Sequence, residues 1–255
     1  MRVVLSAILV LLSAPAWATL VIFVPATDGY VLCGDKRITD TRTGKTFDTE
    51  TKVHRVSHSL AWSAVGNTAF YSNASGVRFW DTFSVVTSVV ASRNEWSQPA
   101  LADAMEQKLV ELFKPAFERQ RISNQANTSL FQTFIYSPAP SGLRLLMTTF
   151  FFVPPNSLRP HRIEQILEHV SGWGSGGAFL AELWRGTNPA LSDVRTTVRI
   201  MDFLNEKPRV SSAEAITMTK EVIRLASERQ HLFQNVRVSA TSDCFIMPLM
   251  ALDKK

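Results

Sequence analysis

Short apolar runs joined by turn residues follow one another after position 18 and predict strands. The runs 19–26 and 30–34 flank Asp28-Gly29, a dipeptide typical of tight hairpin turns. A second hairpin is predicted over 52–65 around His58-Ser59, where two further apolar runs meet. The chain is therefore expected to enter its fold through four strands.

Helical spacing of apolar residues begins near residue 98. A helix is predicted over 98–114 behind a capping serine, and Pro115 is expected to disturb its end. Ser211 and Glu214 form a capping box, which predicts a helix that runs to about Gln230.

The remaining segments fall into a β-rich order with a few open points. Strands are expected at 130–136, 143–153, 236–241 and 244–249, a loop at 154–162, and a helix from Ala178. The pattern leaves 68–92 undecided and allows strand or helix at 163–172. Strands, helices, strands, helices and final strands together predict a layered α+β fold, with helices that cover a two-sheet core.

Residues 1–18 have the pattern of a secretory signal peptide. Arg2 precedes the apolar run 3–12, and Ala16-Trp17-Ala18 is a small-x-small cleavage site. The apolar run is shorter than the roughly 20 residues that span a bilayer. We therefore expect cleavage after Ala18 to release a domain of 19–255 into the periplasm or medium, without a membrane span.

Composition narrows the class of protein further. Hydrophobic residues make up 45% of the chain and charged residues 19%, as in a globular domain rather than a disordered one. The formal net charge of +5 is spread without a run of five basic residues, so no nucleic-acid partner is expected. Cys33 and Cys244 could pair in an oxidising compartment, but we expect two buried free thiols in strands.

Cleavage after Ala18 would make Thr19 the N-terminal residue, with a hydroxyl nucleophile and an amine that can act as its base. A nearby lysine would lower the pKa of the amine and of the hydroxyl, and a carboxylate would hold that lysine in place. Lys52 and Asp35 supply these groups, and Asp35 ends the first hairpin near the point where it began. This chemistry needs no cofactor. No metal site is expected either, because His54 and His58 do not share a helix face.

The segment 19–39, with Thr19 and Gly34-Asp35 at this spacing, resembles the start of a mature proteasome β subunit and of its bacterial homologues. Thr51-Lys52-Val53 is similar to the strand that carries the family's lysine, and 63–68 is similar to its small-residue turn. The resemblance implies a four-layer αββα fold of the N-terminal-nucleophile hydrolase type and a homo-oligomeric ring. It assigns the oxyanion N–H to Gly66, the positioning of the amine to Ser175, and the substrate pocket to Ile38, Glu50, His54 and Ala64.

Two departures from the family pattern stand out. Gln230 replaces an aspartate of the late helix, and no serine follows it at the family's spacing. About 25 residues at 185–209 match no family element and are interpreted as an insertion.

The expected function is that of an exported threonine peptidase whose export and activation are one cut. Peptides or unfolded proteins would be its substrates, and no ATPase partner is expected in a compartment without ATP. Two alternatives stay open: an exported acyl-amidase of the N-terminal-nucleophile class that acts on small molecules, and a non-catalytic assembly or binding protein that retains the fold, which Gln230 favours.

Overall fold

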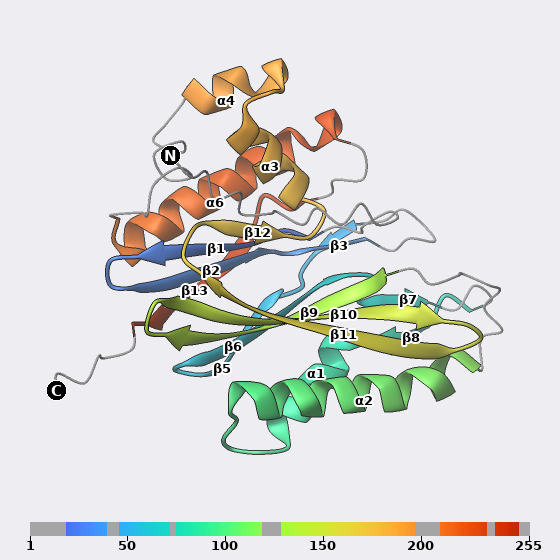
Figure 1. Ribbon diagram of the computed structural model, residues 1–255. Coiled ribbons are helices and arrows are strands. Elements are labelled where there is room, and N and C mark those ends of the chain that lie inside the picture. Colours follow the sequence, from blue (N-terminus) through green and yellow to red (C-terminus); the bar gives the residue numbers. More distant parts are fainter. Residues whose placement is uncertain are drawn as a thin grey trace, which may run out of the picture.

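The computed structural model describes residues 19–39, 46–71, 75–118, 129–196, 210–233 and 238–249. The signal peptide predicted over 1–18 lies outside these ranges. The described chain mixes helices with strands and contains two main sheets, stacked face to face with helices on their outer sides (Figure 1).

The first sheet is antiparallel and has the strand order β12-β1-β2-β13. Its members are β1 (Val21–Ala26), β2 (Gly29–Asp35), β12 (Ser171–Trp173) and β13 (Ser242–Pro248). The predicted first hairpin is confirmed, since β1 and β2 pair from Val21 opposite Gly34 to Ala26 opposite Gly29. This pairing returns the end of β2 to the start of the described chain.

The second sheet has the order β11-β10-β9-β6-β5. Its members are β5 (Val53–Ser57), β6 (Leu60–Gly66), β9 (Ser129–Ala139), β10 (Gly142–Val153) and β11 (Ser157–Leu167). The loop expected at 154–162 is confirmed only for the turn at 154–156. From Ser157 on it is wrong, because β11 begins there and pairs with β10 from Val153 back to Leu143. β11 is an edge strand with mostly exposed side chains, so it lacks the apolar alternation that marks a half-buried strand.

Helices cover the outer faces of both sheets (Figure 1). The first sheet is covered by α3 (Gly177–Arg185), α4 (Ser192–Thr196) and α6 (Ser212–Glu228), and the second by α1 (Thr82–Ala91) and α2 (Gln98–Glu118). Short 3₁₀ turns occupy Pro189–Leu191 and Gln230–Leu232. The proposed insertion at 185–209 thus begins with a turn and α4, and its remainder from 197 lies outside the described residues.

The helix starts follow the local signals in the sequence. Ser211 accepts a hydrogen bond from the Glu214 N–H at 3.3 Å, which confirms the capping serine of α6. The helix α2 runs through Pro115 to Glu118, further than predicted. Phe113 and Phe117 are buried on either side of the proline, and their ring centroids lie 3.8 Å apart. Phe117 also packs edge-on against Phe70, so tertiary packing stabilises the last turn.

Two small hairpins flank the main sheets. One pairs β3 (Arg37–Thr39) with β4 (Thr46–Asp48), and the other pairs β7 (Ala69–Tyr71) with β8 (Arg78–Asp81). The segment that the sequence pattern left undecided therefore contains β7, β8 and α1. Asp81 caps α1 by accepting the Phe83 N–H at 3.0 Å.

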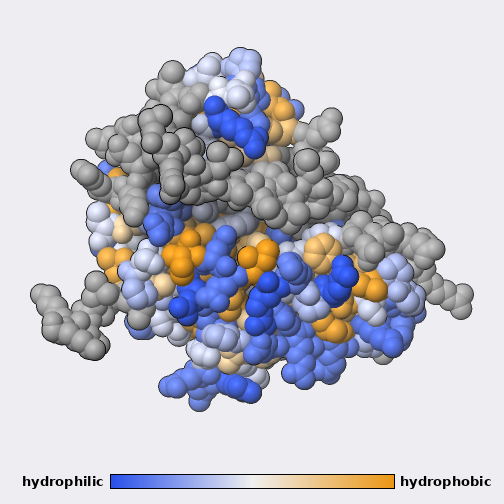
Figure 2. Space-filling view, viewed as in Figure 1, coloured by the Kyte–Doolittle hydropathy of each residue, from blue (hydrophilic) through white to orange (hydrophobic). Residues whose placement is uncertain are grey.

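Apolar side chains fill the space between the layers. The cluster between the two sheets includes Phe23 and Leu32 from the first sheet and Phe134 and Tyr136 from the second. On the outer surface, Figure 2 shows hydrophilic side chains interleaved with separate apolar patches over the half that holds the second sheet and α2. Among the described residues no helix is long and apolar enough to cross a membrane.

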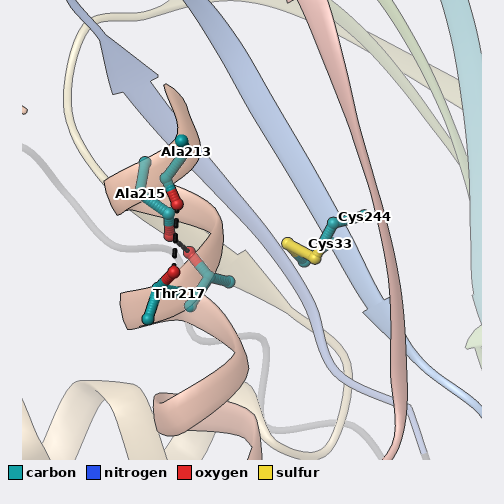
Figure 3. The surroundings of a disulfide bond; sticks show 6 residues. Cys33, Ala213, Ala215, Thr217 and Cys244 are labelled. Carbon is teal, nitrogen blue, oxygen red and sulfur yellow. Dashed lines mark hydrogen bonds between the residues drawn. A yellow bond between two sulfur atoms is a disulfide. The ribbon is translucent and has the colours of Figure 1, made fainter. Parts of the chain in front are cut away.

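Cys33 and Cys244 form a disulfide that joins β2 to β13, so the expectation of two free thiols is wrong. The two residues stand directly opposite each other in the strand register, with their Cα atoms 4.1 Å apart. Figure 3 shows the bond on the side of the sheet that faces α6. The two cysteines are 211 residues apart in the sequence, so no local pattern could predict their pairing.

Candidate active site

Thr19 lies two residues before the start of β1 and is 1% exposed. Its backbone nitrogen donates to Ser175 Oγ at 3.2 Å, and its carbonyl oxygen accepts from the Gly176 N–H at 3.2 Å. In the uncleaved chain this nitrogen is a peptide amide. Cleavage after Ala18 would turn it into an α-amine that faces the same Ser175 hydroxyl. Thr19 and Ser175, which the resemblance had linked, are therefore in contact.

Gly174 allows this contact by its backbone conformation. It has a φ of 89°, and a Cβ added there would lie 2.2 Å from the Thr19 carbonyl oxygen. A side chain at this position would therefore push Thr19 away from Ser175.

Replacing Gly174 by alanine is expected to lower both stability and any activity that depends on Thr19. The positive φ alone costs about 1–2 kcal/mol in a residue with a Cβ, and the clash adds a displacement of Thr19. Gly186→Ala is the matched control, because Gly186 also has a positive φ (68°) but ends α3. Urea unfolding and a rate assay on both variants check this; an equal effect of the two variants would contradict the role of Gly174.

Asp35, at the end of β2, is fully buried and accepts hydrogen bonds from three backbone N–H groups. Its Oδ1 accepts the Leu20 N–H at 2.6 Å, and its Oδ2 accepts the N–H groups of Arg37 and Ser239 at 3.0 and 3.1 Å. Burial raises the pKa of Asp35, and the charge of Lys52 and these three donors oppose the rise. The Asp35 carboxylate is thus bound to the backbone of Leu20, the residue that follows Thr19.

Lys52 directly precedes β5 and is 2% exposed. Burial lowers its pKa, and the negative charges of Asp35 and Glu50 oppose that shift. Gly34 makes the approach possible, because a Cβ there would lie 2.8 Å from Lys52 Cβ. A glycine before the aspartate therefore brings a buried cation toward a buried anion.

Gly66 ends β6 with a φ of 94°, and an added Cβ would lie 2.8 Å from the Leu130 carbonyl oxygen. The oxyanion role of Gly66 stays a prediction.

The four residues predicted to line a substrate pocket come from separate elements. Ile38 lies on β3 opposite Phe47. Glu50 Oε2 lies 4.0 Å from Arg78 Nη2. The other two belong to the second sheet: Ala64 is fully buried in β6, and His54 of β5 is half-buried. The charge of Lys52 acts on His54, and the charge of Glu50 acts on Lys52. The side chains of His54 and Glu50 therefore interact electrostatically with Lys52. The substrate-pocket roles of all four residues stay predictions.

His54 stacks on Trp62 with ring centroids 4.3 Å apart, and its Nε2 is buried without a hydrogen-bond partner in the described ranges. Burial lowers the pKa of His54 below its ordinary value of 6.5. The unfolded chain therefore takes up a proton near pH 6.5 while the folded chain does not, so stability present above pH 6.5 is lost as the pH falls.

His54→Phe and His54→Gln should both flatten this pH dependence, because neither side chain binds the proton. A single proton changes the free energy of unfolding by at most about 1.4 kcal/mol per pH unit. Urea unfolding at pH 7.5 and 5.5 measures the difference, and an unchanged slope in both variants would contradict the prediction.

The structure adds a contact that sequence reasoning missed. Ser239 is fully buried and its N–H reaches Asp35, although a strand was expected over 236–241. That expectation is wrong for the described part, 238–241, which is not a strand. The backbone there turns toward Asp35 instead of pairing, and the sequence carries no motif for this contact.

Gln230, the departure in the late helix region, accepts two hydrogen bonds through Oε1. The Val238 N–H donates at 3.3 Å and Arg37 Nη1 donates at 3.5 Å. The glutamine thus links the turn after α6 to the residues around Asp35 without adding a charge.

The chain matches no protein-family model, and no curated protein sequence matches it. In the ranges that the structure describes, no group of three or more His, Cys, Asp or Glu side chains is placed to hold a metal ion. The geometry around Thr19 is therefore the basis for assigning a function to this chain.

Proposed function

We propose that this chain is an exported hydrolase that uses Thr19 as an N-terminal nucleophile to cleave peptide or amide bonds. One observation carries the proposal: the nitrogen that signal cleavage would free contacts Ser175, and the next residue's N–H is held by buried Asp35 beside buried Lys52. Buried ionisable groups with shifted pKa values are typical of active sites.

In this mechanism the Thr19 hydroxyl attacks the substrate carbonyl carbon, and the α-amine takes the hydroxyl proton. Lys52 lowers the pKa of both groups through its charge, and Asp35 keeps the ammonium in place. The Gly66 N–H is the proposed donor to the developing oxyanion. The amine then protonates the leaving nitrogen, and water hydrolyses the ester on Thr19.

The architecture and the disulfide support the same reading. Helices outside two stacked sheets are compatible with the αββα fold of N-terminal-nucleophile hydrolases, which we propose for this chain. Disulfides persist in oxidising compartments, so the Cys33–Cys244 bond supports export to the periplasm or medium. We further propose a homo-oligomeric ring that acts on peptides or unfolded chains without an ATPase.

The proposal is tested on the exported protein by intact mass and N-terminal sequencing, before and after treatment with a peptide β-lactone. The hydroxyl oxygen would attack the lactone carbonyl, the ring C–O bond would break, and the ring oxygen would leave as an alcohol with the proton. We expect a chain that begins at Thr19 and gains one probe mass on that residue. A mature chain that begins elsewhere would overturn the mechanism.

A non-catalytic binding protein is the second candidate, and Gln230 favours it. Gln230 is neutral and is engaged by Val238 and Arg37, so this part of the network no longer supplies a charge. A folded, exported chain that starts at Thr19 but takes up no probe would support this reading. Cleavage of small acyl-amides, but not of peptides, would instead favour an acyl-amidase.

A further inference from the structure

One of the three N–H groups that hold Asp35 belongs to a residue whose side chain also binds Asp48. Arg37 and Ser239 both donate their backbone N–H to Asp35 Oδ2. The Arg37 side chain donates twice to Asp48, from Nε at 2.8 Å and from Nη2 at 2.9 Å. The Ser239 hydroxyl instead hydrogen-bonds the Thr241 hydroxyl at 2.8 Å.

The β3–β4 hairpin sets the geometry of this link. Arg37 and Asp48 are direct partners in its register, and the two parallel hydrogen bonds fix the plane of the guanidinium. The Arg37 fork lowers the pKa of Asp48, and burial opposes it. The carboxylate therefore stays ionised at neutral pH.

Asp48 is a better partner for Arg37 than Gln230. The Arg37–Gln230 bond is longer, at 3.5 Å, and its acceptor is neutral. The Asp48 side chain is 38% exposed, so the ion pair is expected to add little to global stability. Its two bonds to Arg37 instead orient a residue whose backbone N–H donates to Asp35.

We propose that Asp48 is a positioning residue of the candidate active site. By holding Arg37, it keeps the Arg37 N–H on Asp35 and thereby keeps Asp35 placed for Lys52 and Thr19. This inference rests on the proposed function of Thr19. Asp48 of the β3–β4 hairpin would then supply a carboxylate in place of the late-helix aspartate that Gln230 replaces.

The test is the rate at which the mature protein is acylated by the peptide β-lactone, followed by intact mass at several probe concentrations. Asp48→Ala should lower the maximal rate by about tenfold or more, because small misplacements of reacting groups are costly. The half-saturating probe concentration and the urea midpoint should stay unchanged. Asp48→Glu should restore part of the rate, since it returns the charge.

A double-mutant cycle with Arg37→Met separates positioning from a merely structural role. If Asp48 acts through Arg37, the double variant should lose much less than the product of the two single losses. Asp103→Ala is the matched control. Asp103 is more exposed and pairs with Arg162 at 2.8 Å on α2 and β11, so its loss should leave the acylation rate unchanged.

The outcomes separate the two proposals. If wild-type protein is acylated on Thr19 and Asp48→Ala reacts at the wild-type rate, the role of Asp48 is overturned and the proposed function stands. Multiplicative single losses, or a loss that Asp48→Glu leaves unrestored, would also overturn it. If the wild-type protein is not acylated, the proposed function fails and this inference fails with it.

Discussion

Thr19→Ala is expected to abolish β-lactone acylation and to lower amide hydrolysis by at least about a thousandfold, as removal of a catalytic nucleophile typically does. The variant keeps a small residue after Ala18, so export and cleavage should proceed as in the wild-type chain. Thr19 is buried, but the change removes only a hydroxyl and a methyl group. We therefore expect a loss of stability of about 1–2 kcal/mol.

Thr19→Ser is the matched control for this experiment. Serine retains the hydroxyl and the α-amine, so it should keep measurable acylation, with the probe mass on residue 19. Both variants are compared with wild type by intact mass, N-terminal sequencing and urea unfolding. Acylation of Thr19→Ala at the wild-type rate would show that another residue is the nucleophile.

Lys52→Met is expected to have the largest effect on stability. Met fills much of the same volume but leaves the Asp35 carboxylate buried without its cation. The charges of Lys52 and Asp35 act on each other inside the protein, and leaving one buried charge without its opposite costs up to about 3–5 kcal/mol. Acylation of Thr19 should also fall steeply, because the charge that lowers the pKa of its amine and hydroxyl is gone.

The deficit of Lys52→Met should depend on pH with a defined sign. Without Lys52, burial raises the pKa of Asp35 further above that of the unfolded chain. Protonation then favours the folded variant, so its loss of stability should be smaller at pH 5 than at pH 7.5. Urea unfolding of variant and wild type at both pH values measures this, and a deficit that grows toward pH 5 would contradict it.

The double variant Lys52→Met/Asp35→Asn separates stability from catalysis. Asparagine removes the unpaired charge, so we expect most of the lost stability to return. Acylation should stay low because neither the cation nor its carboxylate is present. Recovery of acylation along with stability would show that the pair is structural only.

The local sequence predicted those elements whose patterns are complete within a few residues. The hairpin of β1 and β2 followed from two apolar runs around a turn, and the start of α6 from the Ser211 cap. The first half of the edge strand β11 was missed, because most side chains of this strand are exposed and no apolar alternation marks it. Pairing with β10, and not its own pattern, makes it a strand.

For the candidate site, too, only the contacts that depend on local sequence could be predicted. The sequence alone identified the candidate reactive groups: Thr19 after a predicted cleavage signal, Asp35 at the end of a return strand, and Lys52 before the next strand. Hairpin pairing is short-range, so the approach of Asp35 to the start of β1 could be predicted.

Only the tertiary structure decided which distant residues complete the site. It placed Ser239 against Asp35, linked Arg37 to Asp48, and paired the two cysteines across β2 and β13. These contacts join segments whose spacing along the chain follows no period of 2 or 3.6 residues. They form because burying the sheets brings the segments together, and a buried carboxylate then needs every N–H donor within reach.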